Sequence, residues 1–204
     1  MQADRLRNSM VAKQIEARSI RDEKVLNAML KVPRHRFIPD VKDAIAYSDH
    51  PQPIGFNQTI SQPYIVAFMT EALRLDGTER ILEIGTGCGY QTAVLAEIAS
   101  HVHTIEVIAE LSRRAEQTLT TLGYSNISFR VGNGREGWPG LTFDGIMVTA
   151  APAELPDVLI EQLKPRGRLI LPVGEASQNL VRYTKTESGY AEETMIAVRF
   201  VPLV

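Results

Sequence analysis

From residue 80 onward, short apolar runs alternate with stretches of helical periodicity, and this alternation limits the fold more than any other feature of the chain. A strand followed by a helix and another strand forms a βαβ unit, in which the two strands lie parallel. The succession therefore predicts an α/β fold with a doubly wound, mostly parallel sheet. The predicted strands are 80–84, 102–106, 127–131, 143–149 and 168–173, and the predicted helices are 90–99, 109–122 and 154–163.

The two ends of the chain follow other patterns. After Gly174, the apolar runs 179–185 and 193–201 are joined by a turn-like segment with no helix between them. We therefore expect a C-terminal antiparallel hairpin at one edge, which completes a seven-stranded sheet. The first fifty residues show helical periodicity and predict a helical N-terminal extension. Its apolar faces are expected at Leu6, Met10, Val11 and Ile15, and at Val25, Met29 and Leu30.

Composition excludes several classes of function. The formal net charge of -2 gives no electrostatic reason to expect nucleic acid or an anionic membrane as a partner. The single cysteine, Cys88, excludes an intramolecular disulfide and a cysteine-based zinc site, and the histidines are not spaced as metal ligands, so no metal is expected. No apolar run approaches the roughly 20 residues of a membrane span. We expect a cytoplasmic monomer.

A glycine-rich segment, LEIGTGCGYQT, follows the first predicted strand and precedes a helix. Gly85, Gly87 and Gly89 let the backbone approach a ligand there, although strand-to-helix turns also use glycine for steric reasons alone. A nicotinamide-nucleotide fingerprint would need a glycine at position 90, where this chain has Tyr90. The loop is therefore predicted to bind a different nucleoside.

Two acids narrow the choice of ligand. Glu83 lies two residues before the first glycine, which is unfavourable for a diphosphate but suits an ammonium group or another cationic centre. Glu106 ends the second strand, about 20 residues downstream, where an acid accepts hydrogen bonds from ribose hydroxyls. An exposed acid at a strand end is the alternative for Glu106. With no Walker lysine, the pattern favours S-adenosylmethionine, a nucleoside with a positive charge and no phosphate.

Several segments, taken in order, resemble one family across nearly the whole chain. The glycine loop is similar to the first motif of S-adenosylmethionine-dependent methyltransferases, and QTIS and VTAAP are marks of the protein-L-isoaspartate O-methyltransferase family. The resemblance rests on VPRHRFIP (32–39), IGFNQTISQPYIVAFM (54–69), LEIGTGCGYQTAVLA (82–96), GNGREGW (132–138), FDGIMVTAAP (143–152), LILPVG (169–174) and VRFVPL (198–203).

The resemblance implies an activity. Such an enzyme methylates the free α-carboxylate of L-isoaspartyl residues in damaged proteins and peptides, leaves S-adenosylhomocysteine, and so begins repair through a succinimide. It also implies a single domain of the methyltransferase type. Residues 1–60 would form the helical extension and a loop on the substrate side, and residues 61–204 the cofactor-binding core.

The resemblance also implies site residues. Ser61 would be the catalytic hydroxyl that orients the substrate carboxylate; capping the helix that begins near Pro63 is its alternative role. The uncharged segment around Ser61 would avoid a cation, which would hold the carboxylate too tightly. The substrate-binding residues would be Thr59, Thr149 and Ala150. The cofactor-binding residues would be Gln62, Tyr64, Glu83, Gly85, Gly87, Gly89, Glu106, Asn133 and Gly134.

One position departs from the family pattern. The family usually has aspartate where this chain has Asn133, and the aspartate is expected to accept a hydrogen bond from the adenine amino group. A neutral amide oxygen accepts a weaker bond. Two other functions stay open: methylation of another carboxylate, a small molecule or RNA, and binding of S-adenosylmethionine without catalysis.

Overall fold

The computed structural model describes residues 2–204. Its helices are α1 (Gln2–Met10), η1 (Val11–Ile15), η2 (Glu16–Arg18), α2 (Glu23–Lys31), η3 (Arg34–Phe37), α3 (Asp43–Ala46), α4 (Pro63–Leu73), α5 (Tyr90–Ala96), α6 (Ala109–Thr121), η4 (Gly134–Glu136) and α7 (Asp157–Glu161). Its strands are β1 (Gln52–Gly55), β2 (Gln58–Ile60), β3 (Arg80–Ile84), β4 (His101–Glu106), β5 (Ile127–Val131), β6 (Phe143–Val148), β7 (Leu163–Val173), β8 (Gln178–Thr186) and β9 (Gly189–Val198). No helix in this part of the chain is long and apolar enough to cross a membrane.

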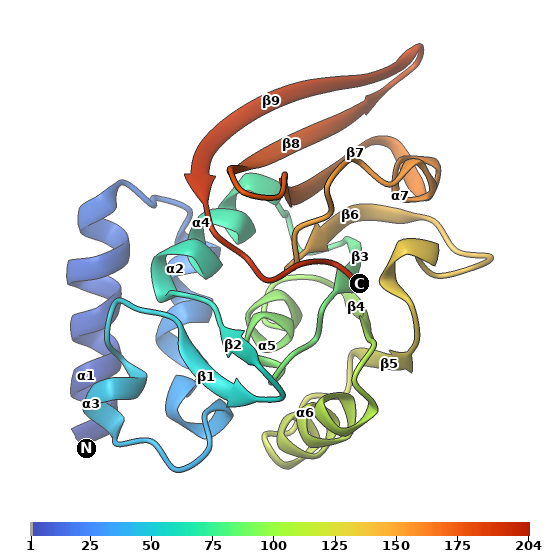
Figure 1. Cartoon of the computed structure of the whole chain (residues 1–204). Coiled ribbons are helices and arrows are strands. Elements are labelled where there is room, and N and C mark those ends of the chain that lie inside the picture. Colours follow the sequence, from blue (N-terminus) through green and yellow to red (C-terminus); the bar gives the residue numbers. More distant parts are fainter. Residues whose placement is uncertain (1) are drawn as a thin grey trace.

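The predicted seven-stranded sheet is confirmed. Its order is β5-β4-β3-β6-β7-β8-β9, and the first five of these strands lie parallel. The predicted C-terminal hairpin is also confirmed, because β8 pairs antiparallel with both β7 and β9. In Figure 1 the hairpin (red) extends at the top beyond the rest of the sheet, and the N-terminal helices (blue) lie at the left.

Two helices are shorter than predicted. The last turn expected for α5 is absent, and the helix ends at Ala96. Helix α7 begins only at Asp157 because Pro156, at its N-cap, has extended backbone, and it ends at Glu161 because Leu163 already pairs with Phe143 of β6. Strand β7 therefore begins at residue 163, five residues before its predicted start at residue 168.

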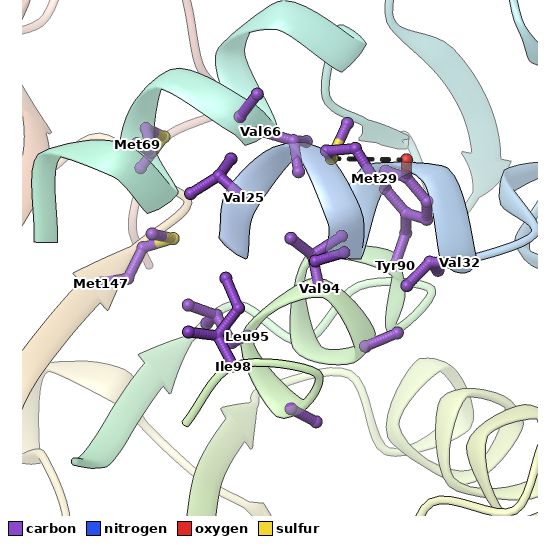
Figure 2. Close-up of a cluster of buried hydrophobic side chains, with 14 of the residues drawn as sticks. Val25, Met29, Val32, Val66, Met69, Tyr90, Val94, Leu95, Ile98 and Met147 are labelled. Atoms are coloured by element: carbon purple, nitrogen blue, oxygen red, sulfur yellow. Dashed lines mark hydrogen bonds between the residues drawn. The ribbon is translucent and has the colours of Figure 1, made fainter. Parts of the chain in front are cut away.

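Side chains of the central strands alternate between two buried clusters, one on each face of the sheet. In β3, Ile81 belongs to the cluster that contains α2, α4 and α5, whereas Leu82 belongs to the cluster that contains Leu159 of α7. This is the period-2 pattern of a strand that is buried on both faces. Figure 2 shows Met29 and Tyr90 in the first cluster, where the Tyr90 hydroxyl donates to the Met29 sulfur at 3.8 Å.

The N-terminal extension shares that first cluster with the α/β core. Met10, Val11 and Ile15 are buried as predicted, and Leu6 is half-buried. Leu30, however, is 36% exposed, so its predicted place on the buried face of α2 is wrong. The helix instead turns Val25, Ala28 and Met29 inward. The division of the chain at residue 60 stays a prediction.

The hairpin of β1 and β2 is absent from the sequence prediction. Three turn-forming residues, Pro51, Pro53 and Gly55, indicated an irregular passage there. Pro53 nevertheless pairs with Thr59 in an antiparallel two-stranded sheet. A proline is tolerated because both strands of such a sheet have a free edge.

The predicted alternative role of Ser61, as the N-cap of helix α4, is wrong. The helix has Pro63 in its first turn as expected, but its N-cap is Gln62. Within residues 2–204 the Ser61 hydroxyl makes no hydrogen bond, so it caps no helix. The N-cap role therefore belongs to Gln62 and not to Ser61.

Gly89 and Gly123 form a natural comparison, because both have a φ of +88°. A Cβ at Gly89 would lie 2.9 Å from Leu119 and 3.2 Å from Ala115 of α6, whereas one at Gly123 would meet nothing within 4 Å. We expect Gly123→Ala to cost about 1–2 kcal/mol of unfolding free energy from backbone strain alone. Gly89→Ala should cost about 1–3 kcal/mol more from overpacking. Urea unfolding measures the free energy of unfolding of both variants. Equal losses would show that α6 moves away from the added Cβ without an energetic cost.

Candidate cofactor and substrate site

Three pockets meet at the carboxyl ends of the parallel strands, beside the neighbouring strands β3 and β6. We name them the strand-end pocket, the inner pocket and the outer groove, with about 700, 340 and 1270 Å³ of empty space. Thr59 of β2 and Thr149, just after β6, line all three. Open α/β sheets bind ligands at this place, where the chain leaves adjacent strands in opposite directions.

The glycine loop lies closely against Thr149. The Thr149 hydroxyl donates to the carbonyls of Gly85 at 2.7 Å and Ile84 at 3.1 Å. A Cβ at Gly85 would lie 2.3 Å from that hydroxyl oxygen, and the φ of Gly85 is +94°. Gly85 is therefore required at this position, and with Gly87 it lines both the strand-end and the inner pocket.

Glu106 lies at the end of β4 and lines the strand-end pocket. Its Oε2 accepts from the backbone N–H of Gly87 at 2.8 Å, and its Oε1 accepts from that of Ile108 at 3.0 Å. The side chain is nearly buried, so the two bonds hold the carboxylate in one orientation. Each oxygen retains a lone pair that can accept a hydrogen bond from a ligand hydroxyl.

Glu83 lies behind the glycine loop and lines none of the three pockets. Its side chain is fully buried, and its Oε2 accepts from the hydroxyls of Thr92 at 2.5 Å and Thr104 at 2.6 Å. Burial raises the pKa of Glu83 to about 8. Its Oε1 has no partner within residues 2–204, which leaves one unsatisfied polar atom beneath the loop for a ligand or for water.

The other residues predicted for the cofactor fall in different places. Gly134 lines the strand-end pocket, and a Cβ there would lie 2.2 Å from Ile84. The exposed Asn133 does not line it; its side-chain oxygen accepts from the Arg135 N–H at 2.9 Å and caps η4. Gly89 packs on α6 instead. The guanidinium carbon of Arg18 lies over the ring of Tyr64, 3.5 Å from the ring centroid.

Two predicted site residues line pockets apart from the rest of their predicted sets. Gln62, which was expected in the cofactor set, lines the outer groove together with Ser61. Ala150, which was expected on the substrate side, lines the strand-end pocket. Ser61 itself lines both the outer groove and the inner pocket, so this residue lies where the two spaces meet.

The sequence prediction missed a wall of the strand-end pocket, residues 201–204. The Ala151 N–H donates to the Val201 carbonyl at 2.7 Å, and the Leu203 N–H donates to the Ala151 carbonyl at 2.8 Å. Arg135 adds a bond of 2.8 Å to the Leu203 carbonyl. Figure 1 shows this segment returning from β9 across the ends of the parallel strands. Its only sequence signal was the segment VRFVPL.

The strand-end pocket suits a nucleoside without phosphates. Of the residues that line it in this structure, Glu106 alone has an ionisable side chain, and no Lys or Arg is present to bind a phosphate. The buried, partly unpartnered Glu83 adds a polar atom nearby. These residues fit S-adenosylmethionine, with hydroxyl groups to meet Glu106 and a cationic sulfur. Within residues 2–204, no three His, Cys, Asp or Glu side chains are arranged to hold a metal ion.

Comparisons with solved structures agree with this geometry. The chain is similar to a protein-L-isoaspartate O-methyltransferase with a TM-score of 0.88 and 26% identity, over 96% of this chain and 65% of that longer chain. It is also similar to a Plasmodium falciparum protein described as a putative protein-L-isoaspartate O-methyltransferase in complex with S-adenosyl-L-homocysteine. There the TM-score is 0.84 with 27% identity, over 96% and 97% of the two chains.

Curated relatives found by sequence share a higher identity with this chain than these two solved structures do. A protein-L-isoaspartate O-methyltransferase of Picosynechococcus is 52% identical over 199 residues, which cover 97% of this chain and 90% of that protein. The family model for protein-L-isoaspartate(D-aspartate) O-methyltransferase (PCMT) matches residues 5–204. The chain belongs to the protein-L-isoaspartate(D-aspartate) O-methyltransferase family.

Proposed function

We propose that this chain transfers the methyl group of S-adenosylmethionine to the free α-carboxylate of L-isoaspartyl residues in damaged proteins and peptides. The observation that carries the proposal is the position of Ser61. Its hydroxyl has no partner within residues 2–204, and the residue lines both the outer groove and the inner pocket. A substrate carboxylate in the groove would therefore find a free donor beside the cofactor space.

When bound, S-adenosylmethionine supplies an electrophilic methyl group on a positively charged sulfur. Its nucleoside would occupy the strand-end pocket, where Glu106 would accept from ribose hydroxyls and Gly134 would allow close approach of the base. Its amino-acid end would lie in the inner pocket, against Gly85 and Gly87, with Glu83 behind the loop.

The chain's residues need no general base for this reaction. The substrate carboxylate is already ionised at neutral pH and is itself the nucleophile, so no proton has to be removed before the oxygen–carbon bond forms. Ser61 would donate to one carboxylate oxygen and orient the other, while Thr59, Thr149 and Gln62 line the space around it. Holding the two reacting groups in line and excluding water supplies the rate enhancement. The methyl ester can then cyclise to a succinimide, as a backbone nitrogen of the substrate attacks the ester carbon and methanol leaves.

Cofactor binding without catalysis, and methylation of another carboxylate, are the alternatives to exclude. Labelled S-adenosylmethionine with an isoaspartyl peptide should yield a base-labile methyl ester, and the same peptide with a normal aspartyl residue should not. Equal labelling of both peptides would overturn the proposed substrate. We infer in addition a cytoplasmic monomer that binds no nucleic acid; the net charge of -2 supports the last point.

Glu106→Ala should weaken S-adenosylmethionine binding by roughly 1–3 kcal/mol, because hydrogen bonds to a charged group have this magnitude. Calorimetric titration of the folded variant measures the change. Glu110→Ala is the control, since Glu110 is a half-buried acid of α6 that lines none of the three pockets and bonds Arg113 and Arg114. Unchanged cofactor affinity in Glu106→Ala would contradict the ribose assignment.

Ser61→Ala should lower turnover of the isoaspartyl peptide by roughly 10-fold to 150-fold, the equivalent of one hydrogen bond to a carboxylate. Cofactor affinity and thermal stability should change little, because the hydroxyl caps no helix. Rates, calorimetry and melting curves on the same variant separate these effects. A stable variant with normal turnover would remove Ser61 from the mechanism.

Asn133→Asp should tighten cofactor binding by something on the order of 1 kcal/mol. The oxygen of Asn133 already caps η4, and the remaining NH₂ can only donate. An aspartate can keep the cap with one oxygen and accept from the adenine amino group with the other. Asn179→Asp on β8 adds the same charge elsewhere and serves as the control in calorimetry. Equal or lower affinity in Asn133→Asp would count against an adenine contact at this position.

A further inference from the structure

Arg34 is a fully buried cation that the chemistry of the site has not yet used. It begins η3, and its guanidinium donates to two carbonyls, those of Ala46 and Ser61, at 2.8 Å each. The guanidinium carbon also lies 4.8 Å from the centroid of the Tyr90 ring. Within residues 2–204 no acid pairs with Arg34, and its Nη1 has no hydrogen-bond partner.

Such a side chain is unfavourable as a mere structural support. Burial lowers the pKa of Arg34 below its ordinary value, yet an arginine remains protonated in a protein. An uncompensated buried charge costs several kcal/mol, which an apolar side chain of similar size would avoid. Departures of this kind are concentrated at functional sites. The contacts of Arg34 therefore need a functional reason.

The bond to Ser61 gives that reason. Within the part of the chain that the structure describes, it is the only hydrogen bond that Ser61 makes. Ser61 lies between the end of β2 and the N-cap of α4, so neither element holds it by its own backbone bonds. The orientation of its hydroxyl depends on the anchored carbonyl, because side chain and carbonyl share one Cα.

We propose that Arg34 is a positioning residue for methyl transfer: by holding the Ser61 carbonyl, it places the Ser61 hydroxyl where the outer groove meets the inner pocket. This inference rests on the proposed function. Arg34 lines none of the three pockets, and two of its donors already serve carbonyl oxygens. At Ser61 the substrate carboxylate would therefore meet a neutral hydroxyl, and Arg34 behind it would not bind the nucleophile directly.

The position of Arg34 differs from an expectation of the sequence analysis about charge near Ser61. The uncharged QTIS segment was expected to keep cations away from the carboxylate, and its own side chains do so. A cation nevertheless lies directly behind the segment, from VPRHRF near the N-terminus. Of the basic residues in that motif, His35 bonds the Tyr47 hydroxyl at 2.8 Å and Arg36 lines a different pocket.

A double-mutant cycle tests the proposal with Arg34→Lys, Ser61→Ala and both together. A lysine keeps the charge but lacks the planar fork that spans two carbonyls. We expect Arg34→Lys to lower kcat/KM for the isoaspartyl peptide at least tenfold, with less than a twofold change in cofactor Kd. In the Ser61→Ala background, Arg34→Lys should lower kcat/KM less than twofold further, since the positioned group is already gone.

Tyr47→Phe is the matched control. It removes a buried hydroxyl bonded to His35 in the same region without touching Ser61. It should change kcat/KM less than twofold. Where Arg34→Lys does not fold, Arg34→Met, which is uncharged and of similar length, takes its place in the cycle.

Amide hydrogen exchange separates this proposal from the proposed function. Exchange in residues 58–64 should accelerate at least tenfold in Arg34→Lys and stay unchanged in Tyr47→Phe, whether or not the peptide is the true substrate. Unaltered exchange there would overturn the positioning role. So would losses that multiply independently in the double mutant, or a loss of cofactor affinity as large as the loss of kcat/KM. Failure of the wild-type chain to form a base-labile ester would overturn the proposed function alone.

Discussion

The site depends on the close approach of Gly85 to Thr149, the residues that follow the neighbouring strands β3 and β6. Two bonds from the Thr149 hydroxyl join the chain ends where they diverge, and the space for them exists only because Gly85 has no Cβ. From this junction the glycine loop turns toward Glu106, Ala150 lines the strand-end pocket, and Thr149 also lines the outer groove. The strand-end pocket, the inner pocket and the outer groove share this wall, so one short contact sets how a nucleoside and a peptide would lie relative to each other.

The site divides its polar groups according to charge. Acids are found on the side of the predicted cofactor: Glu106 lines the strand-end pocket, and Glu83 is buried beneath the loop. Neutral hydroxyls and an amide line the place where the outer groove meets the inner pocket. Arg34 is bonded to backbone carbonyls behind it, and Arg199, just after β9, also lines the outer groove. This arrangement favours a positively charged sulfur next to a negatively charged carboxylate. Those two charges cancel as the methyl group moves, so the chain does not need a strong charge of its own at the point of transfer.

The sheet could be predicted from the sequence because each strand carries its own signal, an apolar run between turn-forming residues. Features that depend on distant partners could not. Pro53 marks a break locally, and only its pairing with Thr59 makes a hairpin. Arg34 resembles a surface cation in the sequence, and only the fold brings the carbonyls of Ala46 and Ser61 to it. The family motifs indicated Ser61 and Glu106, but a motif does not say which way each side chain faces; Gln62 and Ala150 show the difference.

The contribution of residues 201–204 to the strand-end pocket links the site to the order of synthesis. Every other wall of that pocket comes from residues 58–150, which leave the ribosome earlier. The parallel strands and the glycine loop can therefore fold while the pocket is still open on one side, and the wall is added when the chain crosses Ala151 and is anchored by Arg135. A chain that stopped at the end of β9 would retain the whole sheet and still lack one wall of its ligand pocket. One wall of the pocket thus comes from the segment that follows the last strand of the sheet, while the other walls come from residues 58–150.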